Sequence, residues 1–421
     1  DFYDNGRIIG ENNNFPENFH IKTILRGGLG TIKWYNPHLP LNEKDKAFKG
    51  CNCVGASAEV HYAFLPYNYK GAYLRHYSTK TAEEYCNKMK KGFPDRKWDM
   101  DKEGQYLIET RFFRYNEVTE EKVKMFKDKL GVDLSYLLPS NIEKSNDTKI
   151  YSLCYAKKDF DFLDDKVITP LQVGAANNTG VCWLKDNTGE NISHFNYFFI
   201  ENTGTYWIWK NVKDAKYKGQ MQYRRPLKGV DETMDFDEMF KNYDVITCEP
   251  FHHPDHKVPT KEEPMVISAD TVEQGYGFSN CIDDLYILEM AVKMYFPEYA
   301  KDWDKYIKNG PDLYYSNGFV MRAEDFDKYA KFSYECLNYY LEIADIHSEK
   351  DLIEHVKYNI EVGKYVRYGD PSKVPPEAIK WQSEIGGFLS ERLWTLWVQH
   401  NFPQERIYKT PYIKMEEGMY T

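Results

Sequence analysis

Two adjacent arginines, Arg224 and Arg225, are the residues of this sequence that first suggest chemistry. They follow the segment 218–223 (Lys-Gly-Gln-Met-Gln-Tyr), which is predicted as a strand. Neighbouring residues of a strand point to opposite faces of the sheet. Both guanidinium groups can therefore reach one ligand only where the strand ends. Pro226, directly after the pair, favours an end of the strand there. Arginine is always charged and presents forked donors that match phosphate oxygens. The pair therefore predicts a diphosphate site, and the competing interpretation is a pair of surface arginines in ion pairs.

The polar segment 186–193 is the second candidate for ligand contact. It follows residues 181–184, predicted as a strand, and precedes residues 196–210, predicted as a helix. Loops at the carboxyl ends of strands in an α/β sheet are where ligands bind, so the candidates are Asp186, Asn187, Asn191 and Ser193. Asn191 or Ser193 could also cap the helix that follows, and capping is compatible with ligand contact.

Glu391 is the third candidate, near the start of a helix predicted over residues 388–400. The helix dipole stabilises the charged form of a carboxylate in the first turns. An ionised carboxylate suits a general base that takes a proton from a sugar hydroxyl. The alternative is a structural ion pair that includes Glu391 and Arg392.

Metal sites are not favoured. The Asp-x-Asp pairs at 159–161 and 235–237 are of a type that binds Mg²⁺ or Mn²⁺, but neither follows an apolar strand. In a chain with a net charge of −10 we interpret both as solvated charge. The histidine-rich stretch 252–256 suits a transition metal, but its proline-rich setting favours a flexible loop. No glycine-rich phosphate loop occurs in the sequence. From these observations together we expect no metal site and no required cofactor, and Mg²⁺ and Mn²⁺ are not favoured.

The composition is that of a soluble globular protein. The chain has 421 residues, of which 42% are hydrophobic and 29% charged, and its 35 tyrosines provide many aromatic faces for sugars or bases. The acidic balance argues against nucleic acid as a partner. No apolar run reaches the roughly 18 residues of a membrane-spanning helix. The eight cysteines lack a full zinc spacing, so we expect free thiols in the cytoplasm.

The elements that must position the candidates alternate after residue 148. The predicted strands cover 149–155, 171–174, 181–184, 218–223, 243–248 and 312–321. The predicted helices cover 196–210, 281–295, 323–346 and 388–400. Such alternation predicts an α/β sheet covered by helices on both faces.

The first 147 residues have a different character. Short strands are predicted at 21–25, 31–35 and 72–77, and a helix from residue 80 has Thr81 as its N-cap. Residues 117–130 give the clearest helix of the charged stretch that follows, and the polar segment 139–147 is the predicted linker. We therefore expect a smaller α+β segment before the main sheet.

The order of the motifs resembles a bacterial family of capsular-polysaccharide and exopolysaccharide glycosyltransferases. The matching segments are 171–174 (Leu-Gln-Val-Gly), 186–193, 204–211 (Gly-Thr-Tyr-Trp-Ile-Trp-Lys-Asn), 222–225 (Gln-Tyr-Arg-Arg), 243–245 (Tyr-Asp-Val), 317–321 (Asn-Gly-Phe-Val-Met) and 387–392 (Gly-Phe-Leu-Ser-Glu-Arg). Three positions depart from the family pattern. Gln222 replaces a histidine, 156–158 reads Ala-Lys-Lys instead of His-Lys-Pro, and Gly204 replaces an apolar residue.

This resemblance implies a GT-A-like, Rossmann-like mixed sheet flanked by helices over residues 148–421. It implies transfer of a sugar from a nucleotide-sugar, UDP-linked, to a hydroxyl of a growing cell-surface polysaccharide or a lipid-linked oligosaccharide. Arg224 and Arg225 would replace the metal ion of usual GT-A enzymes, and Glu391 would be the catalytic base. The donor would be held by Gln172, Gly174, Asp186, Asn187, Asn191, Ser193 and Asn317, and the site would be lined by Tyr206, Trp207, Gln222 and Tyr223.

Residues 1–95 are similar to the closing segment of family-2-like GT-A glycosyltransferases, on the segments 20–24, 37–40, 76–84 and 91–95. The two resemblances imply a division into 1–95, a helical connector over 96–147, and a transferase domain over 148–421. They also imply an upstream transferase domain in the same polypeptide. The expected partners are a nucleotide-sugar donor and a saccharide or lipid-linked saccharide acceptor, with peripheral association at the inner face of the membrane.

Two other functions remain open at this stage. A non-catalytic carbohydrate-binding or scaffold domain could keep this fold, and the departures at Gln222 and Ala156 support it. A glycoside hydrolase would use paired carboxylates, but it gives the arginine pair no role.

Overall fold

The computed structural model of the chain describes residues 33–36, 39–41, 49–51, 57–59, 81–91, 100–113, 116, 118–139, 142–155, 163–178, 182–255, 257–259, 266–368 and 370–413. The chain divides into two compact units, Asp1–Asp133 and Leu134–Thr421, so the boundary lies inside the predicted connector. The strands predicted at 21–25 and 72–77 and the acidic pair at 159–161 lie outside the described residues.

The first unit contains two short hairpins and a helical group. Its elements are β1 (Lys33–Asn36), β2 (Leu39–Leu41), β3 (Lys49–Cys51), β4 (Ser57–Glu59), α1 (Ala82–Lys91), α2 (Met100–Leu107) with the π-helical turn Ile108–Phe112, and α3 (Glu120–Leu130). The predicted N-cap of α1 is confirmed: the Thr81 hydroxyl accepts from the Glu84 N–H at 3.2 Å, and the Glu84 carboxylate accepts from the Thr81 N–H at 3.3 Å. Tyr85, Phe112 and Phe126 pack the helices together.

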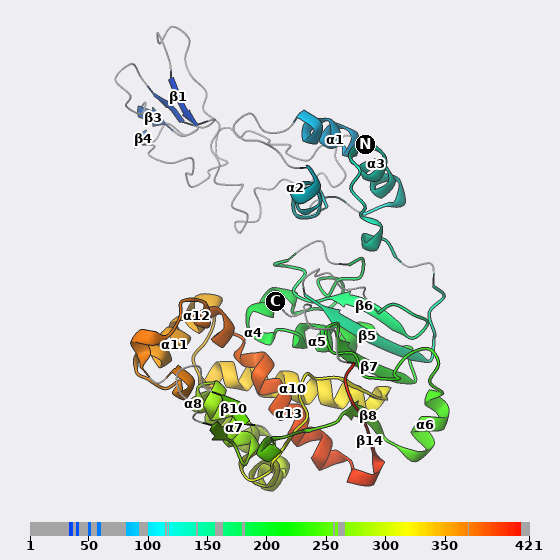
Figure 1. The fold of residues 1–421 in the computed structure, drawn as a ribbon, viewed down its shortest axis with the longest axis vertical. Helices are drawn as coiled ribbons and strands as arrows, with labels where there is room; N and C mark the ends of the chain where they lie inside the picture. The colour runs from blue at the N-terminus through cyan, green and yellow to red at the C-terminus, as the bar shows by residue number, and fades with distance from the viewer. Residues whose placement is uncertain are drawn as a thin grey trace. The chain divides into compact units, whose positions relative to one another are not determined.

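The second unit is built on a six-stranded mixed sheet with the order β14-β8-β13-β7-β5-β6 (Figure 1). The strands are β5 (Thr148–Cys154), β6 (Ile168–Gln172), β7 (Tyr217–Gln222), β8 (Val245–Cys248), β13 (Phe319–Arg322) and β14 (Ile407–Thr410). Five of them run in one direction, and β13 alone is antiparallel to its neighbours β7 and β8. Most strand residues are buried, as expected for a sheet covered on both faces.

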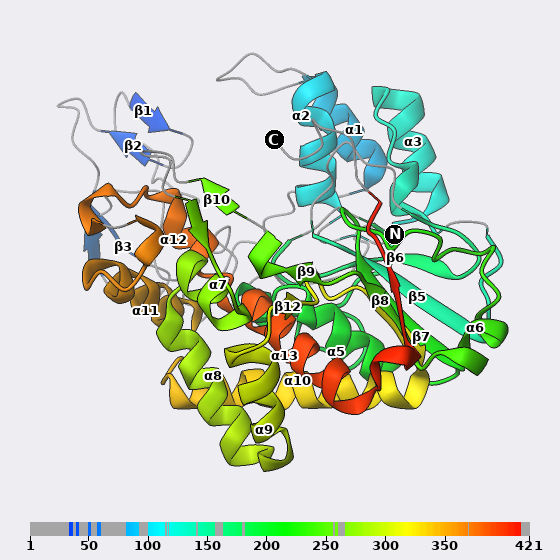
Figure 2. The same ribbon diagram turned by 60° about the horizontal axis from the view of Figure 1, so that its bottom comes forward.

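Helices α10 and α13 pack together against the sheet, and α5 packs on α10 (Figures 1 and 2). The remaining helices include a group formed by α7, α8, α11 and α12, beside the sheet (Figure 2). The bounds are α4 (Asn196–Phe199), α5 (Asn202–Asn211), α6 (Phe236–Asn242), α7 (Val272–Ser279), α8 (Ile282–Tyr295), α9 (Ala300–Trp303), α10 (Ala323–Ile343), α11 (Glu349–Glu361), α12 (Glu377–Gln382) and α13 (Ile385–Asn401). The predicted α/β class, a mixed sheet flanked by helices, is confirmed.

Two short strand pairs complete the second unit: β9 (Phe251–His252) with β12 (Asp312–Leu313), and β10 (Lys257–Pro259) with β11 (Val266–Ser268). An ion pair joins the sheet to α10. The side chain of Lys218, the second residue of β7, is 1% exposed, and its Nζ lies 2.6 Å from Oδ1 of the half-buried Asp327.

Three predicted elements are wrong in detail. Residues 182–184 form no strand; beside them Lys185 makes a single bridge to Gln172. The helix predicted over 196–210 is broken at Ile200, where φ is +50°, and the Asn196 side chain donates to the Ile200 carbonyl at 2.6 Å. The strand predicted over 312–321 is two strands, β12 and β13, because Ser316 and Asn317 both have positive φ.

The predicted linker is partly tied to the second unit. The Ser145 N–H donates to the Lys166 carbonyl at 2.8 Å, and the Lys144 ammonium forms an ion pair with Asp164. The polar character of residues 142–147 therefore reflects specific contacts with the loop before β6.

Candidate active site

Most of the predicted site residues lie where the strands of the main sheet end, along one side of the sheet. The registers place the carboxyl ends of β5, β6, β7, β8 and β14 at this edge, together with the amino end of β13. Loops at the carboxyl ends of parallel strands are free to carry ligand-binding groups because the strands themselves are fixed by the sheet. We refer to the loops at this edge as the C-edge.

Arg224 and Arg225 lie in a tight turn at the end of β7. The Arg225 N–H donates to the Gln222 carbonyl at 2.9 Å, which closes the turn directly after the strand. Both arginine side chains are half-buried. Arg225 donates to the Ser316 hydroxyl and its guanidinium lies 5.7 Å from the Tyr315 ring centre, whereas Arg224 lies 5.5 Å from the ring centre of Tyr223. The turn thus delivers two positive charges to the C-edge, as its sequence predicts.

The two residues before Gly318 form an unusual backbone turn at the amino end of β13. Ser316 has φ of +65° and Asn317 has φ of +48°, a region that costs residues other than glycine roughly 1–3 kcal/mol each. Two hydrogen bonds fix its backbone: Gln220 Nε2 donates to the Asn317 carbonyl at 3.1 Å, and the Ser316 N–H donates to Glu391 Oε1 at 2.8 Å. Strained turns held from several sides are typical of functional sites.

The Asn317 side chain is buried and points to helices α5 and α13. Its Nδ2 donates to Glu201 Oε1 and to the Ser390 hydroxyl, both at 2.8 Å. Its Oδ1 has no hydrogen-bond partner among the described residues. Asn317, predicted to contact the donor, therefore lies at the C-edge and connects the turn to the two helices.

Three carboxylates gather around this turn. Glu391 Oε1 accepts from the Ser316 N–H at 2.8 Å, and Glu391 Oε2 accepts from Arg392 Nη1 at 2.9 Å. Arg392 is itself buried, and burial lowers the pKa of its guanidinium. A second carboxylate, Glu384, directly precedes α13. Burial raises the pKa of Glu384, and the nearby charges of Arg224 and Lys380 oppose this rise. The third carboxylate is Glu201.

Glu201 is the site residue that the sequence did not reveal. Its side chain is buried, with 8% of the residue exposed, and burial raises its pKa from 4.5 to about 7. Its hydrogen bond to Asn317 opposes this rise, and the negative charges of Glu391 and Glu384 add to it. No motif surrounds Glu201 in the sequence, because its environment is made by residues more than 100 positions further along the chain.

The loop after β6 forms the second part of the C-edge. Gly174 has φ of +65°, and a Cβ there would overlap the Asn196 side chain. Asp186 is buried and organises this loop: Oδ2 accepts from the Gly174 N–H at 2.9 Å, and Oδ1 accepts from the Ala175 N–H at 3.0 Å and from the Ser193 hydroxyl. Asp186 and Ser193 thus hold the loop backbone, whereas their direct contact with a donor stays a prediction.

The other predicted donor residues surround this loop. Gln172, the last residue of β6, is buried and donates from Nε2 to the Asn178 carbonyl at 2.6 Å. Asn187 is exposed. Asn191 Oδ1 accepts from the Ser193 N–H, two residues further on, at 3.2 Å. The N-caps of the two short helices that follow are Ile192 and Phe195, neither with a side-chain cap, so the predicted capping by Asn191 or Ser193 is wrong, and ligand contact by Asn191 stays a prediction.

Tyr206 and Trp207 lie on α5 and contact the segment 186–193. The Tyr206 hydroxyl donates to Glu190 Oε1 at 3.0 Å, and its ring packs against Tyr334 of α10. Trp207 is buried, and its indole N–H donates to the Thr188 carbonyl at 2.9 Å. The structure therefore brings together Arg224, Arg225, Gln222, Tyr223, Asn317 and Glu391, and separately the loops that carry Gln172, Gly174, Asp186, Asn187, Asn191 and Ser193. Tyr206 and Trp207 lie beside the second group, through their hydrogen bonds to Glu190 and Thr188.

The acidic and histidine-rich segments have structural contacts. Asp235 caps α6, and Asp237 pairs with Lys216 at 2.5 Å. His252 pairs with Asp312 at 2.6 Å, where the carboxylate raises the pKa of the imidazole. Within the described ranges, no three His, Cys, Asp or Glu side chains are grouped to hold a metal ion. In the same part of the chain, no helix combines the length and apolar character needed to span a membrane.

The second unit is thus an α/β domain with an arginine- and carboxylate-bearing edge. Residues 149–356 match the model of a family described as a domain of unknown function, DUF4422. This range begins in β5 and ends in α11, so it includes the arginine turn and Asn317 but not Glu391.

Among solved structures, the chain is similar to the apo structure of WbbM, a bifunctional glycosyltransferase, with 22% sequence identity and a TM-score of 0.44. The similarity covers 63% of this chain and 45% of that chain, so this chain spans less than half the length of WbbM. No curated protein matches the sequence.

Proposed function

We propose that the second unit is a glycosyltransferase that moves a sugar from a UDP-linked donor to a hydroxyl of a growing polysaccharide or lipid-linked oligosaccharide. The observation that carries the proposal is the turn at the end of β7. It presents Arg224 and Arg225 at the C-edge, beside Asn317 and near Glu391. A developing diphosphate charge is best stabilised by fixed positive groups of this kind.

The two arginines take the role that a metal ion has in usual GT-A enzymes. A guanidinium is planar, permanently charged and weakly hydrated, so it can neutralise a leaving diphosphate without a metal. Turnover should therefore continue in EDTA, and loss of all turnover in EDTA would contradict the metal-independent mechanism.

Glu391 is the proposed base that takes the proton from the acceptor hydroxyl. Its carboxylate is held in place by two donors, the Ser316 N–H and Arg392 Nη1. Replacing Glu391 with Gln keeps the side-chain size and removes the base. We expect Glu391→Gln to lower kcat at least 100-fold while UDP binding is kept, and near-normal kcat would exclude this role.

The nucleoside of the donor is proposed to lie against the loop after β6, near Gly174 and the segment 186–193. The carboxylate of Asp186 holds two backbone N–H groups of that loop, so this surface is preformed. Incubation with a panel of nucleotide-sugars and saccharide acceptors tests the function. Release of UDP that depends on the acceptor supports it, and inertness of the whole panel together with no UDP binding would contradict it.

A glycoside hydrolase is the second candidate, because Glu201 and Glu391 form a pair of nearby carboxylates with different environments. A hydrolase uses one protonated and one ionised carboxyl group. However, the Glu201 carboxylate is buried and accepts from Asn317, so it is not directed at an open substrate site. Hydrolysis of aryl glycosides without any nucleotide would favour this candidate over the transferase.

A non-catalytic carbohydrate-binding or scaffold domain is the remaining alternative. It would keep the sheet and lack the donor site. Thermal unfolding with and without UDP separates it from the transferase, because only a domain with a donor site gains stability from UDP.

A further inference from the structure

Glu201 is a buried carboxylate that the proposed transfer reaction does not use. Only 8% of the residue is exposed, and the charges that act on it most strongly, those of Glu391 and Glu384, are both negative. A charged carboxylate in such a place lowers the stability of the fold. Residues that cost stability are typical of functional sites, so the environment of Glu201 indicates a task.

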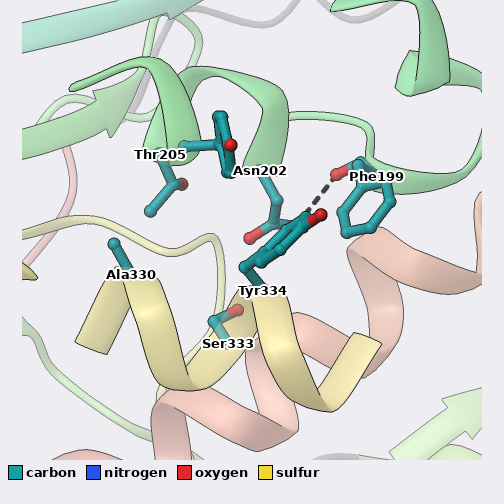
Figure 3. A pocket seen from close by; sticks show the side chains of 7 residues that line it. Phe199, Asn202, Thr205, Ala330, Ser333 and Tyr334 are labelled. Atoms are coloured by element: carbon teal, nitrogen blue, oxygen red, sulfur yellow. Dashed lines mark hydrogen bonds between the residues drawn. The ribbon is translucent and has the colours of Figure 1, made fainter. Parts of the chain in front are cut away.

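The chain holds Glu201 at a defined junction between α4 and α5. Asn202, the next residue, donates from Nδ2 to the Phe199 carbonyl at 3.0 Å (Figure 3), and the Gly204 N–H donates to the Glu201 carbonyl at 2.9 Å. The Glu201 side chain reaches α13 because Gly387 has no side chain there: a Cβ at Gly387 would lie only 3.3 Å from Glu201 Oε2. Both the backbone and the carboxylate of Glu201 are therefore fixed in position.

The Glu201 carboxylate contacts the turn at residues 316–317 through the Asn317 side chain. Glu201 Oε1 accepts from Asn317 Nδ2 at 2.8 Å, and Ser390 Oγ accepts from the same nitrogen at 2.8 Å. Ser390 is itself fixed, because its hydroxyl donates to the Gly387 carbonyl at 2.7 Å. An amide nitrogen has two hydrogens, so Glu201 and Ser390 together use its full donor capacity. The Asn317 side chain is thus anchored to the start of α5 and to α13.

The turn that Asn317 anchors also holds the arginine and the proposed base. The Ser316 hydroxyl accepts from the Arg225 guanidinium, and the Ser316 N–H donates to Glu391 Oε1 at 2.8 Å. Both residues of the turn have positive φ, +65° and +48°, so the backbone needs contacts to stay in this conformation. Loss of an anchor would let the turn relax and displace the guanidinium of Arg225, and a small displacement of a binding group is enough to weaken a ligand site.

We propose that Glu201 is a positioning residue of the donor site. Through its hydrogen bond to Asn317 it fixes the turn that holds Arg225 in place for the diphosphate, and its buried carboxylate does not touch the donor itself. This role rests on the proposed function, in which Arg225 binds the diphosphate of a UDP-linked donor.

Three substitutions of Glu201 separate its hydrogen bond from its charge. Glu201→Gln keeps the length and an acceptor oxygen but has no charge, Glu201→Asp keeps the charge but is one methylene shorter, and Glu201→Leu has a similar volume without polar atoms. UDP affinity is measured by calorimetric titration, at a temperature at which circular dichroism shows each variant of the full chain to be folded. Glu405→Leu, at an exposed position, is the matched control and should bind UDP like the parent protein.

We expect Glu201→Gln to bind UDP within about threefold of the parent protein, because the hydrogen bond to Asn317 is kept. Glu201→Asp and Glu201→Leu should each weaken UDP binding roughly tenfold or more, because neither side chain makes that bond. An effect of charge alone would give the opposite order, with Glu201→Asp closest to the parent protein. That order, or parent-like affinity in Glu201→Leu, would overturn the proposal; where Glu201→Leu is not folded, Glu201→Asp supplies the same comparison.

A second measurement tests whether Glu201 acts through Asn317. Asn317→Gly removes the side chain, and glycine adopts the φ of +48° at this position without strain. In the Asn317→Gly background, Glu201→Leu should change UDP affinity by less than about threefold, whereas independent effects would multiply. Full multiplication of the two effects would overturn the positioning role and leave the proposed function intact. Absence of UDP binding by the parent protein would instead contradict the proposed function, and the positioning role with it.

Discussion

Replacing Glu201 with Gln should make the protein more stable at pH 8, although it removes a hydrogen-bonding carboxylate from the interior. In the folded protein burial raises the pKa of Glu201 from 4.5 to about 7. Burial therefore opposes ionisation of Glu201, and above pH 7 the folded protein has to hold the charged form in its interior. Gln has the shape of the protonated form, and its oxygen can still accept from Asn317 Nδ2.

The sign of the pH dependence follows from proton binding. Between pH 4.5 and 7 the folded protein binds the Glu201 proton and the unfolded chain does not. The stabilisation from Glu201 is thus fully present below pH 4.5 and is lost as the pH rises through 7. A difference of about 2.5 pKa units at about 1.36 kcal/mol each gives roughly 3 kcal/mol, an upper estimate, because relaxation around the charge reduces it.

Urea unfolding at pH 4.5, 6, 7 and 8 measures the effect as the difference in unfolding free energy between Glu201→Gln and the parent protein. We expect a difference near zero at pH 4.5 and about 2–3 kcal/mol in favour of the variant at pH 8. Glu405→Gln, at an exposed position, is the control and should show the same difference at every pH. A constant difference for Glu201→Gln across the series would refute the argument, because the carboxyl group would then titrate alike in both states.

Two further predictions concern the framework of the site. Gly174→Ala should lower the unfolding free energy by roughly 3 kcal/mol, because its positive φ and an overlap with Asn196 both oppose a Cβ. Gly229→Ala, with φ of +74° and open space around it, should cost only about 1 kcal/mol, and equal losses in urea unfolding would exclude the overlap. Asp327→Ala should lower the unfolding free energy by roughly 1–3 kcal/mol, because it takes a partner from buried Lys218 while Asp327 itself is 35% exposed, whereas Lys218→Met should cost less; a larger loss for Lys218→Met would contradict the argument.

Local signals in the sequence were sufficient for several elements. The Thr81-Glu84 capping pair marked the start of α1, and the apolar pattern of 281–295 identified α8 within one residue. The end of β7 at the arginines was also predictable, because Pro226 and the change in polarity both occur there. These features depend on residues close together in the chain.

Other features depend on contacts that no local pattern encodes. The break at Ile200 requires the Asn196 side chain to capture a backbone carbonyl, and the turn at Ser316 requires Glu391 from α13. Glu201 was missed because its environment comes from Asn317 and from the helix after Glu384. Trp207, which the family resemblance places at the substrate site, is buried and donates its indole N–H to Thr188 of the segment 186–193, and its contact with a sugar or acceptor stays a prediction.

The most direct test of the central claim is calorimetric titration of UDP into the full chain in the presence of EDTA. The account predicts that UDP binds without a divalent ion. Arg224→Ala and Arg225→Ala should each weaken binding by roughly 10- to 100-fold, the loss of about 1.5–3 kcal/mol from a charge-assisted contact. Arg367→Ala, at an exposed position over Trp381, should leave the affinity unchanged. Equal UDP affinity in the two turn variants, or binding that appears only when Mg²⁺ or Mn²⁺ is added, would contradict the account.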